Sequence, residues 1–286
     1  MNTRARASLA RTAAIVACIV VTLAPSAAVE AQAQPKPYAP QIGQPGKDVI
    51  WVPTPDELVE RMLRMAQTTA NDYVVDLGSG DGRIAIAAAK NFGARSLGIE
   101  YDPDMVELSN RRAAMQGVTA RAHFTRADIF EADFSQATVV TMYLLPQLNL
   151  KLRPKILEMR PGTRVVAHQF NMDGWQPDET TSLEGRVAYL WIVPAKVQGA
   201  WYVQAGDEAF DLTLEQHFQM IEGSVKLGSV AAGLRDTRLE GERIQFTFVD
   251  NDGARHDFSG RVGDGTMEGS AKREGGAETA WRAVRR

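Results

Sequence analysis

Two different periods of apolar and polar positions occur along the chain, and the change between them falls near residue 195. Before that point, short apolar runs of strand length alternate with stretches whose apolar residues recur every three or four positions, the spacing of one helix face. Strands separated by helices predict an α/β fold with a doubly wound, mostly parallel, Rossmann-like sheet. Its ligands are expected at the carboxyl ends of the strands. The predicted strands and helices are 73–77, 83–91, 96–100, 103–115, 122–126, 138–143 and 164–168.

The segment TPDELVERMLRMA marks the start of the first helix. Thr54 suits an N-cap, Pro55 suits the first helical position, and Glu57 completes a capping box. Later in the chain, alternating basic residues predict a solvated helix face. These residues are Lys151, Arg153 and Lys155.

The pattern changes after residue 194. The runs 210–214 and 244–248 alternate apolar and polar residues with a period of two, as in a half-buried strand. Turn formers such as Asn251-Asp252-Gly253 separate runs of this kind. This region is therefore predicted to be a small antiparallel β barrel or sandwich of roughly six to eight strands.

The first 33 residues have the pattern of a cleavable export signal. Arg4, Arg6 and Arg11 precede a nearly unbroken apolar run over 12–23, and small residues follow. The run is short for a membrane span of about 20 residues, so no stable span is expected after cleavage. The protein is then expected in a bacterial periplasm or cell envelope. The predicted organisation is a signal peptide over 1–33, a linker over 34–50, an α/β domain over 51–196 and a β domain over 197–286.

Charge and cysteine content exclude several classes of function. The formal net charge of −3 over 286 residues lacks the basic excess that is typical of nucleic-acid-binding proteins, so no nucleic-acid partner is expected. The single cysteine, Cys18, lies in the apolar run of the predicted signal. The mature chain would therefore have no disulfide, thiolate nucleophile or cysteine-based metal site. His123, His217 and His256 lack metal-ligand spacing, and no metal site is predicted.

The stretch VVDLGSGDGR, residues 74–83, carries the clearest chemical pattern. Three glycines at alternate positions follow an apolar strand and precede a helix, which brings backbone N–H groups close to a ligand. A dinucleotide site of the G-x-G-x-x-G type is one alternative. However, Arg83 stands at its third glycine, where close helix–strand packing needs a small residue. Asp76 and Asp81 on either side of the loop favour instead a ligand with a positive or neutral head.

This arrangement resembles the first motif of class I S-adenosylmethionine-dependent methyltransferases. The resemblance continues along the chain, with Glu100 at the end of the second predicted strand and Asp128 after the third. It implies that Asp76 and the glycine backbone receive the methionine end of the cofactor, Glu100 the ribose hydroxyls and Asp128 the adenine amino group. The residues that it assigns to the cofactor are Asp76, Gly78, Ser79, Gly80, Gly82, Glu100, Tyr101, Asp128 and Ile129.

A closer resemblance covers residues 51 to about 176. The segments WVPTPDELVERML, VVDLGSGDGRIAIAAA, GIEYDPDMVELSNRRA and TVVTMYLLPQLNLKLRP are similar to the family of small seven-strand lysine methyltransferases. That family includes the enzymes acting on the adenine nucleotide translocase and on the membrane-ring protein c of ATP synthase. The resemblance implies a protein-lysine N-methyltransferase with a protein substrate. It does not extend to the C-terminal β region.

The acceptor side of the site is less well defined by the sequence. The segment Tyr143-Leu144-Leu145-Pro146 lacks the Asn/Asp-Pro-Pro-Tyr signature of many enzymes that methylate base amines or glutamine. Tyr143 and Pro146 are the predicted substrate rim. His168, at the end of the fifth predicted strand, is placed either for a catalytic base or for a structural hydrogen bond. Methyl transfer mainly needs a well-held, deprotonated nucleophile, so no catalytic residue is assigned.

Two other functions stay open at the level of sequence. One is a non-catalytic envelope module that binds a partner through a methyltransferase fold. The export signal favours it, because S-adenosylmethionine is made in the cytosol, and the same fact keeps a cytosolic location open. The other is an NAD-dependent oxidoreductase, which Arg83 disfavours.

Overall fold

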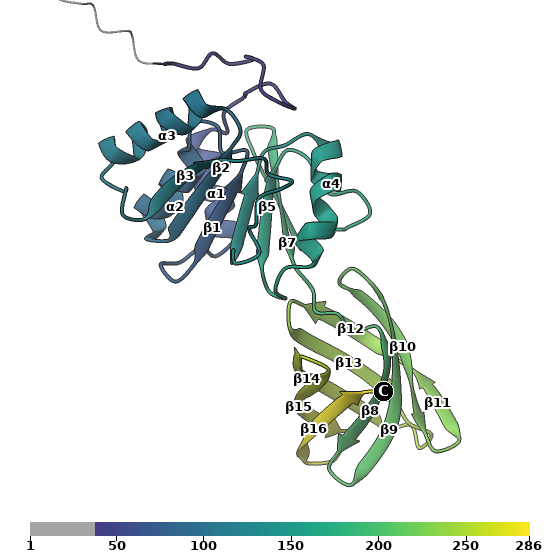
Figure 1. Ribbon diagram of the computed structural model, residues 1–286. Coiled ribbons are helices and arrows are strands. Elements are labelled where there is room, and N and C mark those ends of the chain that lie inside the picture. Colours follow the sequence, from purple (N-terminus) through teal and green to yellow (C-terminus); the bar gives the residue numbers. More distant parts are fainter. Residues whose placement is uncertain (1–37) are drawn as a thin grey trace, which may run out of the picture. The chain divides into compact units, whose positions relative to one another are not determined.

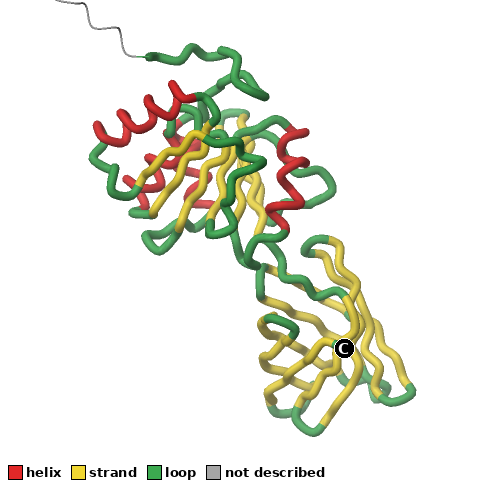
Figure 2. Tube along the Cα trace, in the orientation of Figure 1, coloured by secondary structure: helices red, strands yellow, loops and turns green. Residues whose placement is uncertain are grey.

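The computed structural model describes residues 38–286, and Tyr38–Arg286 forms one compact unit (Figure 1). The predicted signal peptide over 1–33 and the first residues of the predicted linker lie outside the described residues. The strands of the described part form a seven-stranded and a nine-stranded sheet. Figure 2 shows helices beside the strands of the first sheet, whereas the second is made of strands and turns. The predicted fold class, a mostly parallel α/β sheet followed by an antiparallel barrel, is confirmed.

The seven-stranded sheet has the order β3-β2-β1-β4-β5-β7-β6. Strands β1 to β5 pair in parallel, and the chain reverses its direction along the sheet between β1 and β4. A ligand crevice is expected at this switch point, beyond the carboxyl ends of the strands. The strands are β1 (Tyr73–Leu77), β2 (Arg95–Glu100), β3 (Ala122–Arg126), β4 (Val139–Met142), β5 (Arg164–His168), β6 (Glu179–Leu183) and β7 (Arg186–Ile192).

Helices cover both faces of this sheet, because its strands are apolar on both faces. The four helices are α1 (Asp56–Met65), α2 (Arg83–Phe92), α3 (Pro103–Met115) and α4 (Pro146–Leu157). On one face, Leu58 of α1 and Ile84 of α2 share an apolar core with Val74 of β1. On the other face, Leu152 of α4 shares a core with Val75. Neighbouring residues of β1 therefore face opposite layers, as expected for a doubly wound sheet.

Two strands at the end of this sheet were not predicted. Strands β6 and β7 form an antiparallel hairpin, and β7 pairs antiparallel with β5. The tight connection through Glu184 and Gly185, both at positive φ, permits only an antiparallel pair.

The predicted capping box at the start of α1 is wrong. The N-cap residue is Pro55, whose side chain makes no capping hydrogen bond. The Thr54 hydroxyl lies instead 3.0 Å from Nδ1 of His168, 114 residues further along the chain. A tertiary contact has thus replaced the local one.

The nine-stranded sheet is antiparallel throughout, with the order β11-β10-β9-β8-β16-β15-β14-β13-β12. Its ends approach each other, because the Leu234 amide donates to the Gly223 carbonyl at 2.9 Å and the Thr237 hydroxyl donates to the Ile221 carbonyl at 2.7 Å. The sheet is therefore a nearly closed barrel, with more strands than the six to eight predicted. The strands are β8 (Gly199–Ala205), β9 (Glu208–His217), β10 (Met220–Leu227), β11 (Val230–Gly233), β12 (Arg235–Glu240), β13 (Arg243–Val249), β14 (Arg255–Gly263), β15 (Thr266–Arg273) and β16 (Glu278–Arg285).

Aromatic side chains fill the interior of this barrel. Trp201, Phe246, Phe248 and Trp281 are buried in one apolar cluster, and the ring of Trp281 packs edge-on against that of Phe246 at 5.8 Å between centroids. Glycines in the strands make room for close backbone approach. At Gly269 of β15, for instance, a Cβ would lie 2.0 Å from the carbonyl oxygen of Ser259, so only glycine fits there.

Candidate cofactor and acceptor site

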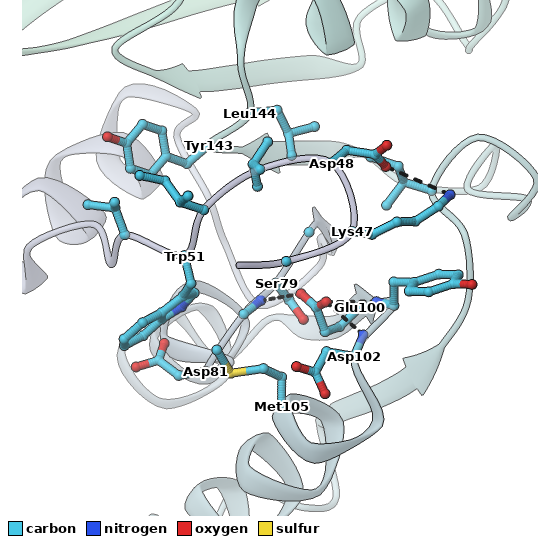
Figure 3. A pocket seen from close by; sticks show the side chains of 18 of the residues that line it. Lys47, Asp48, Trp51, Ser79, Asp81, Glu100, Asp102, Met105, Tyr143 and Leu144 are labelled. Carbon is cyan, nitrogen blue, oxygen red and sulfur yellow. Dashed lines mark hydrogen bonds and ion pairs between the residues drawn. The ribbon is translucent and has the colours of Figure 1, made fainter. Parts of the chain in front are cut away.

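A cavity of about 330 Å³ opens at the carboxyl ends of β1, β2 and β4. The glycine loop after β1, the end of β2, the loop after β3 and the segment after β4 line it, together with residues 44–54. Figure 3 shows Tyr143 and Leu144 on the opposite side of the opening from Glu100 and Asp102. The cavity thus has two chemically different sides at the switch point of the sheet.

The glycine loop turns tightly and stays close to β2. The amides of Gly78 and Ser79 donate to the Ile99 carbonyl at 2.9 and 3.0 Å. Gly80 has φ +53°, and a Cβ there would lie 2.7 Å from Nε1 of Trp51. The backbone, rather than side chains, therefore forms this wall of the cavity.

Gly82 has a different role from the predicted one. It does not line the cavity, although the resemblance assigned it to the cofactor. It adopts φ +77° directly before α2, and a Cβ would lie 2.8 Å from the Phe124 ring and from Cβ of Ser109. Gly82 is therefore required by the packing of α2 against neighbouring elements.

Asp76 lies at the base of the cavity and is only 2% exposed. The Thr141 hydroxyl donates to its Oδ1 at 2.8 Å. Burial raises the pKa of Asp76 to about 7; the Thr141 hydrogen bond opposes this rise, whereas the nearby charges of Asp81 and Glu100 add to it. A cationic group placed here would restore the charged carboxylate, so the site favours an ammonium ligand.

Glu100 is held in a fixed orientation at the end of β2. Its Oε2 accepts from the Gly80 amide at 2.8 Å, and its Oε1 accepts from the amides of Tyr101 and Asp102 at 2.8 and 3.0 Å. A carboxylate oriented in this way has lone pairs left for the two hydroxyl groups of a ribose.

Asp128 follows β3, and Ile129 beside it also lines the cavity. The Phe130 amide donates to Oδ1 at 2.9 Å, and Nζ of Lys47 lies 2.5 Å from Oδ2. The hydrogen bond from Lys47 is the main cause that holds the pKa of Asp128 below its ordinary value. The Lys47 ammonium also lies 4.8 Å from the centre of the Tyr101 ring.

Arg83 stands in the place of the third glycine of a dinucleotide loop, and the structure gives it a partner. Its Nη2 donates to Asp81 at 2.8 Å and its Nη1 donates to the Thr54 carbonyl at 2.8 Å. Burial alone would raise the pKa of Asp81, but Arg83 and Arg112 lower it below its ordinary value. Asp81 is thus neutralised by arginines, which leaves Asp76 and Glu100 to face the cavity.

Part of the predicted linker forms a hairpin that lines the cavity. The Gly43 amide donates to the Trp51 carbonyl, and the Trp51 amide donates to the Gln44 carbonyl, both at 2.9 Å. Lys47 lies at the tip of this hairpin, between Gly46 and Val49, whose backbone groups are also hydrogen-bonded. The prediction of an extended linker over 34–50 missed this structure; its signal was the apolar Trp51-Val52-Pro53.

The acceptor side of the cavity is apolar and aromatic. Tyr143, Leu145, Leu148 and Phe170 line it, and the rings of Tyr143 and Phe170 stack with centroids 6.3 Å apart. Of the predicted substrate rim, Tyr143 lines the cavity and Pro146 does not, because Pro146 is the exposed first residue of α4.

His168 lies behind the Tyr143 ring and does not itself line the cavity. The two rings are 3.9 Å apart between centroids, and His168 is 2% exposed. Burial lowers the pKa of His168 to about 4, and the positive charge of Arg186 adds to this shift. The imidazole is therefore neutral at neutral pH. Within residues 38–286, no three His, Cys, Asp or Glu side chains gather closely enough to hold a metal ion.

Comparison with known proteins identifies the same part of the chain. Residues 76–179 match the model of the ANTKMT methyltransferase domain. A protein-lysine N-methyltransferase of Saccharolobus islandicus is 42% identical over 151 residues, which cover 51% of this chain and 94% of that protein. A mouse lysine N-methyltransferase named for its action on protein c of ATP synthase is 39% identical over 132 residues, covering 46% of this chain but only 53% of the mouse protein.

A solved structure gives a match of similar extent. The crystal structure of an RNA methyltransferase from Salinibacter ruber, in complex with S-adenosyl-L-homocysteine, shares 51% sequence identity with this chain. The match has a TM-score of 0.50 and covers 51% of this chain and 96% of that one. None of these matches extends over the whole of this chain, and each covers about half of it or less.

The sheet topology, the glycine loop and the carboxylates at the strand ends define a class I S-adenosylmethionine-dependent methyltransferase. Within that class, the chain belongs to the family of the ANTKMT methyltransferase domain and its lysine methyltransferase relatives. S-adenosylmethionine is its cofactor, and the NAD-dependent alternative is no longer favoured.

Proposed function

We propose that this enzyme transfers the methyl group of S-adenosylmethionine to Nζ of a lysine in a protein substrate. The observation that carries the proposal is the division of one cavity into an acidic side, with Asp76 and Glu100, and an apolar side, with Tyr143 and Phe170. The first side suits the ammonium and ribose of the cofactor. The second suits the aliphatic stem and the amine of a lysine.

The cofactor side consists of residues that hold groups of known chemistry. Asp76 would pair with the cofactor ammonium, because a buried carboxyl with a raised pKa gains most from a cation. Glu100 would accept the ribose hydroxyls, and Asp128 would accept the adenine amino group with Ile129 and Tyr101 beside the ring. The backbone at Gly78, Ser79 and Gly80 would lie along the methionine part.

The apolar side has a direct chemical use. A lysine ammonium must lose its proton before the nitrogen lone pair can attack, and removal from water lowers its pKa. The bound cofactor supplies an activated methyl group. In the transfer, the nitrogen–methyl bond forms while the sulfonium–methyl bond breaks, leaving a thioether and a methylated ammonium. Tyr143 and Phe170 would exclude water and align the amine with the methyl carbon.

Charge at the mouth of the cavity also supports a basic protein segment as substrate. Asp48 lines the opening, and Asp56, at the start of α1, has an 85% exposed side chain. These carboxylates favour the approach of a lysine-containing segment and disfavour a phosphate backbone. RNA is the second candidate acceptor, because the similar Salinibacter ruber protein is described as an RNA methyltransferase.

Transfer of a labelled methyl group distinguishes these acceptors. The purified chain is incubated with methyl-tritiated S-adenosylmethionine and with soluble, envelope and RNA fractions of the source cells. We expect label that survives ribonuclease, is lost on proteolysis and co-migrates with methyllysine after acid hydrolysis. The Asp76→Asn variant is the control for enzyme-dependent labelling. Label in RNA alone, or cofactor binding without transfer to any fraction, would contradict the proposal.

A further inference from the structure

We infer that Thr54 is a positioning residue that links the glycine loop of the cofactor side to the aromatic wall of the acceptor side, acting through His168 on Tyr143. The inference rests on the proposed methyl transfer to an amine on the apolar side. No sequence pattern gave Thr54 this role, since its predicted role was the N-cap of α1. Its test separates this role from the function itself.

Thr54 makes one hydrogen bond toward each side of the site. Its backbone carbonyl accepts from Nη1 of Arg83 at 2.8 Å, and Arg83 in turn is bound to Asp81 of the glycine loop. Its hydroxyl lies 3.0 Å from Nδ1 of His168, which ends β5. One residue thus joins the segment after the hairpin, the cofactor loop and the central sheet.

Both members of the hydroxyl–imidazole pair are buried. Thr54 is 3% exposed and His168 is 2% exposed. Water therefore cannot readily replace either partner, and loss of the hydroxyl leaves Nδ1 without its partner. The hydrogen bond fixes the rotation of the imidazole ring about its side-chain bonds.

The imidazole transmits this orientation to the wall of the cavity. Its ring lies 3.9 Å from that of Tyr143 and is tilted by 35°. Tyr143 lines the cavity and stacks on Phe170. Rotation of His168 would therefore displace the aromatic wall against which the acceptor amine is aligned, and small displacements of an aligned nucleophile slow a displacement reaction.

A broken local rule supports a functional role for Thr54. A threonine directly before Pro-Asp-Glu at the start of a helix is suited to capping that helix, a contact worth about 1 kcal/mol in general. Here α1 begins without a side-chain cap, and the hydroxyl points to His168 instead. Departures of this kind from local preference are expected at functional sites.

His168 acts here as a neutral support and not as a base. It does not line the cavity, and Arg186 is the charged group that bears on it. Burial and that charge keep the imidazole uncharged above pH 5. The pH profile of methyl transfer is therefore expected to show no inflection from His168 between pH 5 and 9.

The central test compares Thr54→Val with Thr54→Ser. Valine keeps the shape but removes the hydroxyl, so we expect kcat to fall about tenfold or more, with the Kd of S-adenosylhomocysteine unchanged within twofold. Serine keeps the hydroxyl and should restore most of the activity. In ¹⁵N-histidine NMR spectra, Thr54→Val should shift the Nδ1 resonance of one histidine, and Thr54→Ser should leave it near its original position.

Two further variants make each outcome decisive. Thr163→Val removes an equally buried threonine hydroxyl, 4% exposed and outside the cavity, and should leave kcat unchanged. His168→Asn should lower kcat as Thr54→Val does, and the double variant should be little worse than either single one. It also serves as the test if Thr54→Val does not fold.

Three results would overturn the inference. They are wild-type kcat in Thr54→Val, no rescue by serine, and a cofactor Kd that rises as much as kcat falls. Failure of the proposed function gives a different result, in which the wild-type protein binds cofactor but methylates no lysine. In that case the NMR comparison still decides whether Thr54 sets the state of His168.

Discussion

Two largely buried aspartates, one at each sheet, show how differently the two regions of this molecule use a carboxyl group. Asp76 in the seven-stranded sheet has a single hydrogen-bonding side chain, Thr141, and burial raises its pKa to about 7. Asp250 in the barrel has Nε2 of His256 and Nη2 of Arg273, each 2.9 Å from its Oδ2. Hydrogen bonds from His256 and Arg273 hold the pKa of Asp250 well below its ordinary value.

The difference separates a ligand site from a structural turn. Asp250 has all its partners within the chain, including the Ala254 amide of the same hairpin turn, so it stabilises the connection between β13 and β14. Asp76 has no cationic partner among the described residues and lies at the base of a cavity, so a bound cation would complete it. Incomplete pairing of a buried charge is the physical mark of the functional region here.

The largest expected effect concerns stability in the barrel alone. Trp281→Ala removes a buried ring from the aromatic core and should lower the free energy of unfolding by about 3–5 kcal/mol. Urea titration followed by tryptophan fluorescence measures it. At 4 °C, where the variant is folded, calorimetric titration should give an unchanged Kd for S-adenosylhomocysteine. A matching loss of cofactor affinity would contradict the separation of the two regions.

Asp76→Asn should have the largest effect on cofactor binding. The substitution keeps the shape and removes the charge, so the affinity for S-adenosylmethionine should fall about 100-fold or more by calorimetric titration. Thermal stability should not fall, because a buried carboxyl with a costly charge is removed. Asp250→Asn is the matched control, with the opposite pair of outcomes: lower thermal stability and normal affinity. Equal affinities of wild type and Asp76→Asn would exclude Asp76 from the site.

The pH dependence of binding is the next effect in size. A cation binds the ionised form of Asp76, whose pKa without ligand is about 7, so affinity should rise about tenfold between pH 6 and pH 8. Without ligand the sign for folding is opposite: the folded protein keeps a proton that the unfolded chain releases above pH 4, so stability falls as pH rises from about 4 to 7. Asp76→Asn should remove both dependences, whereas Asp250→Asn should leave the first intact.

The sequence predicted what local patterns encode. The glycine spacing and the strand-end positions of Glu100 and Asp128 placed these residues in one cavity, because parallel strands bring their carboxyl ends to one edge. The period of two predicted the antiparallel region. Gly82 had the same spacing as Gly78 and Gly80, but its role depends on the packing of Phe124, which no spacing reveals.

Contacts between distant residues could not be predicted. Thr54 and His168 are 114 residues apart, and Lys47 and Asp128 are 81 apart. The solvated face predicted for α4 is also partly wrong, since Lys155 donates to the Ala132 carbonyl at 2.6 Å. A long side chain can reach a partly buried carbonyl from a polar face, so polarity alone does not define exposure.

The smallest expected effect sharpens the contrast between paired and unpaired carboxylates on the cofactor side itself. Asp128, unlike Asp76, already has a cation, because Nζ of Lys47 from the hairpin lies 2.5 Å from its Oδ2 and beside the Tyr101 ring. The adenine amino group therefore has to compete with Lys47 for this carboxylate. Since the pair is partly exposed to solvent, Lys47→Met should tighten cofactor binding by no more than about fivefold.

Lys90→Met is the matched control for this change. Lys90 lies on α2, outside the cavity, and donates to Gln116, so its loss changes the net charge equally without freeing Asp128. Calorimetric titration at two salt concentrations should show tighter binding for Lys47→Met alone, with the gain shrinking at high salt, where the ion pair is already screened. Weaker binding by Lys47→Met would mean that the hairpin holds the cofactor rather than competing with it. Asp128 would then resemble Asp250, a carboxylate whose partner within the chain is permanent.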